Sequence, residues 1–324
     1  MRIAVIQFAP KIGQVQDNIR RAQTLCEQLR PNTVDLVCLP EMIFTGYVFP
    51  DADAISPYLE EPRTGPTSRF CAELAARLHC HVVAGYPERL PPHEVEHAEL
   101  SDGRAIKRVG ANAAALYGPD GKFVGEYRKT NLYDTDMTWA KPGTGFVTFH
   151  LPPPLTTLSL GICMDLNVQP PAEWAGLDTG PYEIAEYCVA QRTRVLVLLN
   201  AWLDSKEAPE EEKDWRTINY WALRLRPLWA KVVAEGWPDS DEEDQDSDDS
   251  NSTGEEPGRQ PGEELLVVIC NRTGTENGVT FAGSSSLFSM SRNSGRPRLV
   301  RALGRQQEAA VVWTYPKMPG SAGG

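Results

Sequence analysis

The sequence contains no long apolar run, and several residue patterns that mark common protein classes are missing from it. Of its 324 residues 41% are hydrophobic, but no uninterrupted apolar stretch approaches the roughly 18 residues that a membrane-spanning helix needs. The opening segment MRIAVIQFAP has no small-residue cleavage site of the kind that ends a signal peptide. We therefore expect no membrane partner and an intracellular location, in the cytoplasm or also in the nucleus.

Cysteine pairs and nucleotide-binding motifs are also missing. The seven cysteines are an odd number and include no Cys-x-x-Cys pair, which argues against a disulfide framework and against a structural zinc site. No glycine-rich phosphate loop and no Ser/His/Asp arrangement is present. There is no basic patch with interleaved aromatic residues, so a nucleic-acid partner is not predicted.

Acidic residues exceed basic ones, but the excess is local. The formal net charge is −12, from 44 acidic and 32 basic residues. Residues 239–256 hold 10 of the acidic residues and no basic one, which leaves 34 acidic against 32 basic residues elsewhere. With no apolar side chain to bury, this run is predicted to be a disordered acidic insertion, and an acidic interaction site is the alternative.

Short β-branched runs alternate with helical patterns along the chain, and both β-α-β units and hairpins are indicated. This mixture favours a layered α/β sandwich. The segment 87–103 is polar and rich in proline, and we expect an elaborated loop there. The predicted strands are 3–8, 34–39, 81–86, 112–117, 122–127, 146–151, 155–162, 195–199, 265–271, 285–288 and 311–315, and the predicted helices are 18–29, 68–78, 182–191 and 215–234.

The string His93-Glu94-Val95-Glu96-His97 matches the HExxH pattern of zinc proteases. That pattern needs both histidines one turn apart on a substantial helix, but Pro91 and Pro92 precede the string and Ser-Asp-Gly follows it. We therefore predict a surface segment with two histidines and no metal site.

Three strand ends carry residues that together suggest covalent catalysis. Glu41 follows an apolar strand, Lys129 ends a predicted hairpin strand, and Cys163 ends the apolar run LTTLSLGIC. Alone, each has an ordinary structural explanation as a surface charge or a buried thiol. Together they supply a nucleophile, a proton acceptor and a fixed positive charge without any histidine.

Around these residues the chain resembles the nitrilase superfamily of carbon-nitrogen hydrolases, whose catalytic residues are Glu, Lys and Cys in this order. The resemblance extends over almost the whole length, which implies one carbon-nitrogen hydrolase domain over 1–324 with a four-layer α-β-β-α sandwich. It rests on the blocks IAVIQFAP, LPEMIFTGY, GEYRKTNLY, GICMDLN, LLNAW and CNRTGTENGVTFAGSSSLF.

Within that superfamily, the blocks GICMDLN and KTNLYDTD are most similar to fungal amidases that deamidate an N-terminal Asn or Gln. Many small-acid amidases of the superfamily carry an Arg where this chain has Asn167, and a site for a free carboxylate would need that cation. Its absence, with Asp165 nearby, suits a substrate with a positive α-amine that continues as a peptide. Asp165 is equally explained as a structural residue at the strand end.

The resemblance also implies a mechanism in which Cys163 attacks the side-chain amide carbonyl and ammonia leaves. Glu41 moves the proton, while Lys129 and the backbone N–H of Met164 stabilise the oxyanion. Many members of the superfamily carry a second Glu several residues after the Lys; the acids available here are Asp134 and Asp136, and Asp136 is the expected shorter substitute. No metal or organic cofactor is required.

Two alternatives remain open at this stage. The first is a small-molecule omega-amidase or an aliphatic nitrilase, which would share the three catalytic residues. The second is a non-catalytic binding module that kept the fold. The resemblance also suggests a homodimer, by association alone.

Overall fold

The computed structural model describes residues 1–100, 102–169, 171–177, 179–208, 210–231 and 264–316. The acidic segment predicted at 239–256 lies outside the described residues, as does the end of the helix predicted over 215–234. Within the described part, no helix is both long and apolar enough to cross a membrane.

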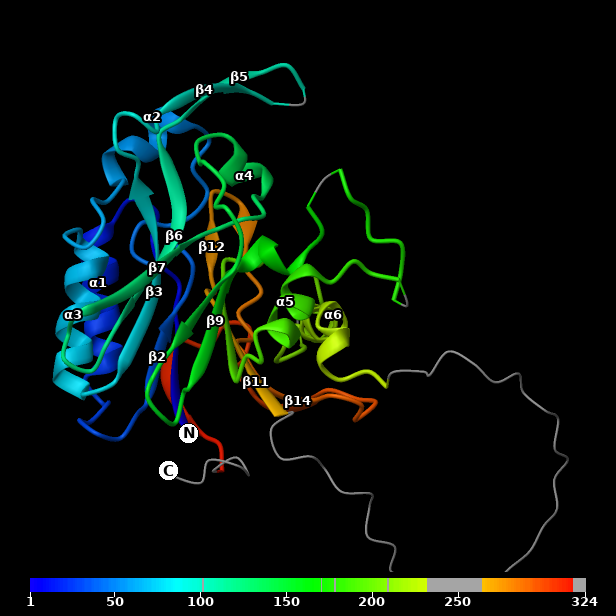
Figure 1. Cartoon of the computed structure of the whole chain (residues 1–324). Coiled ribbons are helices and arrows are strands. Elements are labelled where there is room, and N and C mark those ends of the chain that lie inside the picture. The colour runs from blue at the N-terminus through cyan, green and yellow to red at the C-terminus, as the bar shows by residue number, and fades with distance from the viewer. Residues whose placement is uncertain (101, 170, 178, 209, 232–263, 317–324) are drawn as a thin grey trace, which may run out of the picture.

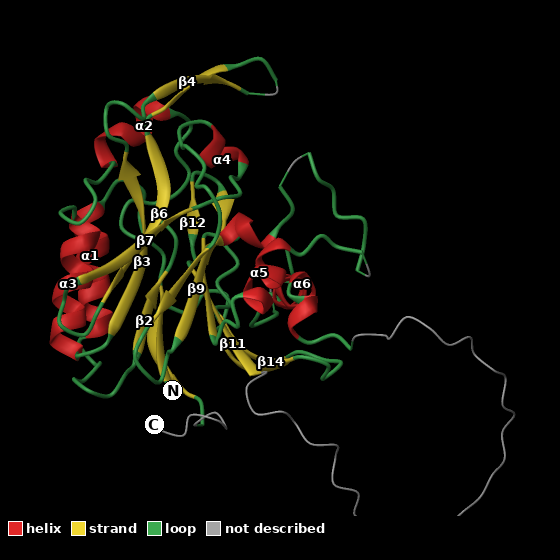
Figure 2. Ribbon diagram, in the orientation of Figure 1, coloured by secondary structure: helices red, strands yellow, loops and turns green. Residues whose placement is uncertain are grey.

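Two mixed β-sheets lie face to face and are covered by helices on their outer faces (Figures 1 and 2). The first sheet has the order β16-β1-β2-β3-β6-β7 and contains β1 (Arg2–Gln7), β2 (Leu36–Leu39), β3 (His81–Arg89), β6 (Gly110–Tyr117), β7 (Phe123–Arg128) and β16 (Ala309–Thr314). The second has the order β15-β14-β11-β10-β9-β8 and contains β8 (Val147–His150), β9 (Thr157–Ile162), β10 (Val195–Asn200), β11 (Glu264–Asn271), β14 (Ser286–Ser291) and β15 (Arg298–Ala302).

The longer helices form the outer layers of this sandwich. Helices α1 and α3 cover the first sheet, and α5 and α6 cover the second (Figure 1). Their bounds are α1 (Val15–Cys26), α3 (Pro66–Leu78), α5 (Glu183–Ala190) and α6 (Trp215–Arg224). The shorter helices are α2 (Ala52–Ile55), η1 (Ser56–Tyr58), α4 (Asp134–Met137), η2 (Cys163–Leu166) and η3 (Arg226–Leu228), and the small hairpins are β4 (Glu96–Glu99) with β5 (Ala105–Arg108), and β12 (Thr275–Glu276) with β13 (Val279–Thr280).

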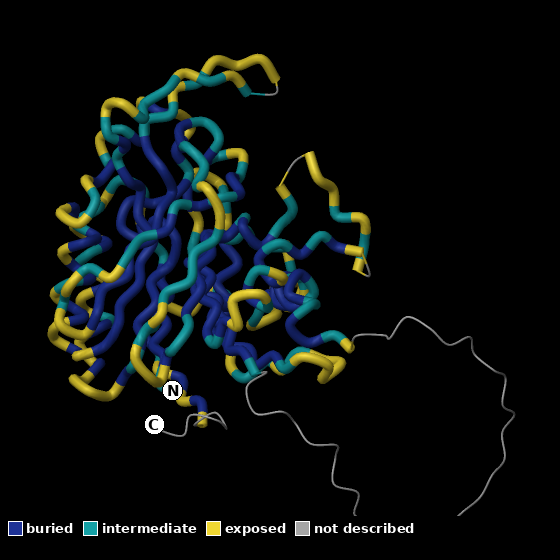
Figure 3. Tube along the Cα trace, viewed as in Figure 1, coloured by how far each residue is buried: buried dark blue, intermediate teal, exposed yellow. Residues whose placement is uncertain are grey.

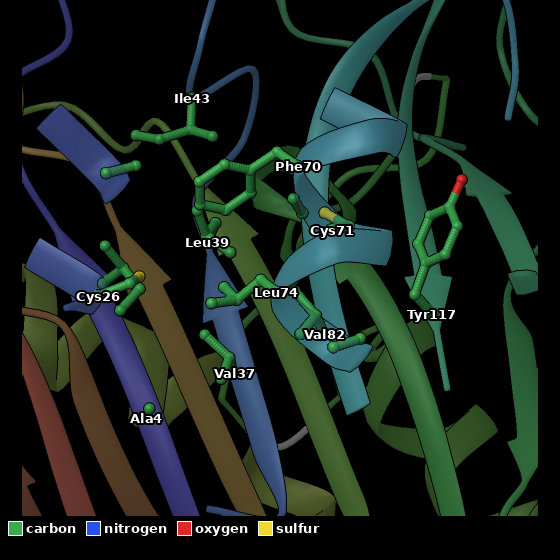
Figure 4. Packing of buried hydrophobic residues seen from close by; sticks show 14 of the residues in the cluster. Ala4, Cys26, Val37, Leu39, Ile43, Phe70, Cys71, Leu74, Val82 and Tyr117 are labelled. Carbon is green, nitrogen blue, oxygen red and sulfur yellow. The ribbon is translucent and has the colours of Figure 1, made fainter. Parts of the chain in front are cut away.

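Three apolar layers hold the sandwich together, and the buried residues follow the two sheets (Figure 3). One cluster fills the space between the sheets and includes Leu160, Val197 and Val268. Another packs α1 and α3 against the first sheet, where Leu74 and Phe70 lie over the strands (Figure 4). A third packs α5 and α6 against the second sheet. Because both faces of each sheet are covered, strands such as β10 are continuous apolar runs.

The first helix differs from the prediction by one turn. It begins at Val15 rather than Asn18, which therefore lies inside α1 and is buried. The Asn18 side-chain amide exchanges hydrogen bonds with the Lys11 backbone and donates to the Phe44 carbonyl at 2.9 Å. Asn18, at which the predicted helix began, thus ties two loops to the helix.

The segment 87–103 is more regular than the predicted loop. Its first residues belong to β3, and its second half contains β4, which pairs antiparallel with β5. Together β4 and β5 form a hairpin that projects from the body of the protein (Figure 1). Strand β15, at the edge of the second sheet, was not predicted; Arg298 and Arg301 break its apolar pattern.

The core between the sheets predicts the result of a truncation. Leu160→Ala should lower the free energy of unfolding by about 2–5 kcal/mol, because the cavity left between two packed sheets cannot collapse fully. Val124→Thr is the control: Val124 lies on β7 and is 40% exposed, so its change should stay within about 0.5 kcal/mol. Urea denaturation of both variants measures this, and equal effects would contradict the packing described.

Candidate active site

The three residues predicted at strand ends are brought together where the two sheets meet. Glu41 follows β2 and Lys129 follows β7, both in the first sheet, whereas Cys163 follows β9 in the second. Glu41 and Lys129 are fully buried, and Cys163 is 9% exposed. The sandwich therefore places a charged pair from one sheet beside a thiol from the other.

The backbone at Cys163 turns sharply from strand β9 into the short helix η2. Cys163 has a φ of +45°, a left-handed conformation that residues with a side chain rarely adopt. Its N–H donates to Oδ1 of Asn200 at 3.1 Å, and Asn200 ends the neighbouring strand β10. A strained turn of this kind, held by a fixed hydrogen bond, presents the side chain at the end of the strand.

Lys129 is the centre of a buried hydrogen-bond network. Its Nζ lies 2.7 Å from Oε1 of Glu41 and 2.6 Å from Oδ2 of Asp136. The side-chain amide of Asn112 donates to Oε1 of Glu41 at 2.7 Å and to Oδ1 of Asp136 at 2.9 Å. Oε2 of Glu41 accepts the N–H of Ala201 at 2.7 Å, which joins this network to the second sheet.

Burial and neighbouring charges set the protonation of these groups. Burial raises the pKa of the Cys163 thiol, the Glu41 charge raises it further, and Lys129 opposes this, so Cys163 rests as a thiol. Burial also raises the pKa of Glu41 against the opposing charge of Lys129, which makes the carboxylate a better proton acceptor. Burial alone would lower the pKa of Lys129, but Asp136 and Glu41 outweigh it and raise that pKa, so the ammonium is retained.

Asp136 lies where the predicted supporting acid was expected. It belongs to helix α4, is fully buried and contacts Lys129 directly. Its Oδ2 also accepts the Tyr47 hydroxyl at 3.2 Å and the N–H of Tyr133 at 3.1 Å. These donors fix the second carboxylate that, with Glu41, holds Lys129.

Asp165 is fully buried and is not among the residues that line the pocket beside Cys163. Its Oδ1 accepts the N–H groups of Thr130 and Asn131 at 3.0 and 2.8 Å. Its Oδ2 accepts the N–H of Ile162 and the Tyr127 hydroxyl, each at 2.7 Å. Burial raises the pKa of Asp165 to about 6, and these donors oppose the shift. Of the two explanations left open by the sequence, the contacts favour the structural one, because Asp165 joins the chain after Lys129 to the strand end before Cys163.

A small pocket of about 170 Å³ opens beside Cys163. Met164, whose N–H was predicted to stabilise an oxyanion, follows Cys163 on the same turn and lines this pocket. Asn167 also lines it, and its Oδ1 accepts the Tyr220 hydroxyl at 2.6 Å. The lining residues are Tyr47, Tyr133, Cys163, Met164, Asn167, Ala201, Trp202 and Leu203.

Two asparagines that the sequence reasoning missed form hydrogen bonds with the predicted catalytic residues. Asn112 lies within the apolar strand β6, and Asn200 ends the apolar strand β10. Both are fully buried, and each holds a member of the predicted catalytic set. Both could have been found in the sequence as lone polar residues in apolar strands, because a buried polar side chain needs a hydrogen-bond partner.

The HExxH string does not form a helix. His93 precedes β4, whereas His97 lies on that strand, so the two side chains are not one helical turn apart. Glu94 forms ion pairs with Arg128 at 2.8 Å and Lys141 at 3.5 Å. Glu94 thus anchors this segment to Arg128, the last residue of β7 and the neighbour of Lys129.

Comparison with known proteins supports the family that the sequence motifs predicted. Residues 2–178 match the family model described as carbon-nitrogen hydrolase. A protein N-terminal amidase of Schizosaccharomyces pombe is 28% identical over 98% of this chain and 100% of its own length. A protein N-terminal amidase of Saccharomyces cerevisiae is 26% identical over 65% of this chain and 47% of its own length, and an omega-amidase of Homo sapiens is 26% identical over 51% and 55%.

Solved structures confirm the predicted four-layer sandwich. A crystal structure of an N-terminal amidase with an Asn-Glu-Ala peptide matches over 97% of both chains, with a TM-score of 0.69 and 22% identity. A CN-hydrolase superfamily protein of Xanthomonas campestris matches over 97% of this chain and 89% of its own, with a TM-score of 0.62 and 17% identity.

The four donors on Asp165 predict the effect of an isosteric change. Asp165→Asn should lower the free energy of unfolding by about 1–3 kcal/mol, because one carboxylate oxygen is replaced by an NH₂ group that faces N–H or O–H donors. Asp134→Asn, on the exposed side of α4, should change it by less than about 0.5 kcal/mol. Urea denaturation of the two variants tests this, and an unaltered Asp165→Asn protein would exclude the structural role.

Proposed function

The chain belongs to the carbon-nitrogen hydrolase family, and from this premise we propose that it is a protein N-terminal amidase. The reaction is hydrolysis of the side-chain amide of an N-terminal Asn or Gln to Asp or Glu, with release of ammonia. Relatives named for this activity, one of them matched over its full length, support the substrate class. The substrate partner is the N-terminus of a peptide or protein.

The charge of the site is the observation that carries the proposal. Among the described residues, those that line the pocket include no Lys, Arg or His. Behind the pocket, two carboxylates share the single ammonium of Lys129. A substrate with a positive α-amine is favoured by this arrangement, whereas a free α-carboxylate would meet no cation on the pocket wall.

Catalysis begins with the thiol of Cys163. Glu41 takes its proton while the sulfur attacks the carbon of the side-chain amide, which forms a C–S bond and a tetrahedral oxyanion. The ammonium of Lys129 and the N–H of Met164 stabilise that oxyanion, and donors of this class are worth roughly 3–4 kcal/mol each. Glu41 then gives the proton to the amide nitrogen, the C–N bond breaks, and ammonia leaves a thioester behind.

Hydrolysis of the thioester completes the cycle. Glu41 accepts a proton from water, the hydroxide adds to the thioester carbonyl, and the same donors stabilise the second oxyanion. Collapse breaks the C–S bond, and the sulfur of Cys163 recovers the proton from Glu41. The product is an N-terminal Asp or Glu; the thiol's original proton has left with ammonia, a proton from water has replaced it, and Cys163 and Glu41 are back in their starting protonation states.

Substrate discrimination follows directly from this assignment. Peptides that begin with Asn or Gln should release ammonia, whereas the same peptides with an acetylated N-terminus should not, because acetylation removes the positive amine. A coupled ammonia assay measures this, with Cys163→Ala as the inactive control. Release from free glutamine but from neither peptide would contradict the proposal and identify a small-molecule omega-amidase instead.

Position 167 predicts a second, graded effect. Asn167→Arg should lower kcat/KM for an Asn-starting peptide by at least about tenfold, because a cation on the pocket wall repels the α-ammonium. Asn167→Gln keeps a neutral amide and should lose much less. Steady-state kinetics on both variants decides the matter, and equal losses would show that charge at this position does not govern substrate choice.

A further inference from the structure

A buried ion pair lies outside the set of groups that the reaction uses. Arg272 follows strand β11 and Glu276 ends strand β12, and both side chains are almost completely buried. Nη1 of Arg272 lies 2.6 Å from Oε2 of Glu276. The guanidinium also donates to the Pro10 carbonyl at 3.1 Å and lies 3.9 Å from the centre of the Phe281 ring.

The other oxygen of Glu276 holds the loop that follows Glu41. Its Oε1 accepts the N–H of Tyr47 at 2.7 Å and the N–H of Val48. Gly46 precedes them with a φ of +85°, and a side chain there would meet Glu276 Oε2 at 2.9 Å. The loop backbone therefore passes directly over the carboxylate, and glycine permits this close approach.

Tyr47 connects this loop to the reacting groups. Its hydroxyl donates to Oδ2 of Asp136, the oxygen that also contacts Lys129. The centre of its ring lies 5.6 Å from the Nζ of Lys129, and the ring lines the pocket beside Cys163. A displacement of the Tyr47 backbone would move the donor that fixes Asp136.

A buried ion pair is weak evidence for stability by itself. Removing two charges from water costs several kcal/mol per ion, and well-packed apolar residues often hold a fold equally well. Here one oxygen of the Glu276 carboxylate pairs with Arg272, and the other accepts two backbone N–H groups. The Tyr47 and Val48 N–H groups are thereby held at one oxygen of a carboxylate whose other oxygen is held by Arg272.

We propose that Arg272 and Glu276 are positioning residues for catalysis, which hold Tyr47 against Asp136 and so keep Lys129 in place beside Cys163. The pair touches no substrate and acts through the 46–48 loop. This inference rests on the proposed function only in taking Cys163 as the nucleophile. It holds for whichever amide the enzyme accepts.

The test is a double-mutant cycle on the reactivity of Cys163 with iodoacetamide, located by mass spectrometry of the labelled peptide. Tyr47→Phe removes the hydroxyl that reaches Asp136. Glu276→Gln leaves one amide oxygen, which can serve either Arg272 or the loop. Each single variant should slow alkylation by about tenfold, the effect of one buried hydrogen bond. The combined variant should be no slower than the slower single, because both changes act on one connection.

Two further variants separate positioning from folding. Glu276→Asp keeps the buried charge balanced but is too short to reach both Arg272 and the loop, so it should slow alkylation as Glu276→Gln does. Glu60→Gln is the matched control, because Glu60 is also buried and accepts two hydrogen bonds from Thr67, at 2.8 and 2.7 Å. It should leave the alkylation rate of Cys163 unchanged.

The possible outcomes are distinguishable. Losses that multiply in the combined variant, or an equal loss in Glu60→Gln, would overturn the proposal, because the effects would then reflect general destabilisation. If wild-type Cys163 reacts no faster than the other buried thiols, the nucleophile assignment fails and this inference fails with it. If alkylation behaves as expected but Asn- and Gln-starting peptides release no ammonia, only the proposed substrate class is overturned.

Discussion

The contact of one buried ammonium with two buried carboxylates is the constraint on which the rest of the structure depends. Lys129, Glu41 and Asp136 are all removed from water, which costs several kcal/mol per ion unless each charge is paired and hydrogen-bonded. The fold meets this requirement with donors from many elements, among them Asn112, Tyr47 and the N–H of Ala201. A proton acceptor and a fixed cation are thereby set in place before substrate arrives.

The two-sheet architecture explains how such a site is assembled. One sheet supplies the charged groups and the other supplies the thiol, so their relative position depends on the apolar core between the sheets. Polar connections cross that boundary at the site: Ala201 donates to Glu41, and Asp165 accepts the Tyr127 hydroxyl and the N–H groups of Thr130 and Asn131. The apolar core sets the spacing of the sheets, while these hydrogen bonds set the register of the reacting groups.

The sequence predicted the sheets and singled out three residues that the structure brings together, because both leave local signals. Apolar runs such as 195–199 marked the strands, and Glu41, Lys129 and Cys163 stood at strand ends within family blocks. The role of Asp165 could not be predicted, because a carboxylate accepts hydrogen bonds from a substrate amine and from backbone N–H groups alike. The backbone N–H groups of Tyr47 and Val48, which Glu276 accepts, lie more than 220 positions away from it in the sequence, so no local pattern indicates these contacts. Hydrogen bonds and ion pairs between polar groups far apart in the sequence could be identified only from the structure.

The proposed mechanism depends on a thioester at Cys163, and trapping that intermediate is its most direct test. An Asn-starting peptide is turned over with increasing hydroxylamine, and the products are separated by mass. A hydroxamate should replace the former amide and increase at the expense of the N-terminal Asp product, since hydroxylamine and water compete for one acyl-enzyme. Formation of the Asp product alone at every hydroxylamine concentration would contradict the proposed mechanism, because water would then be attacking the amide without a covalent intermediate.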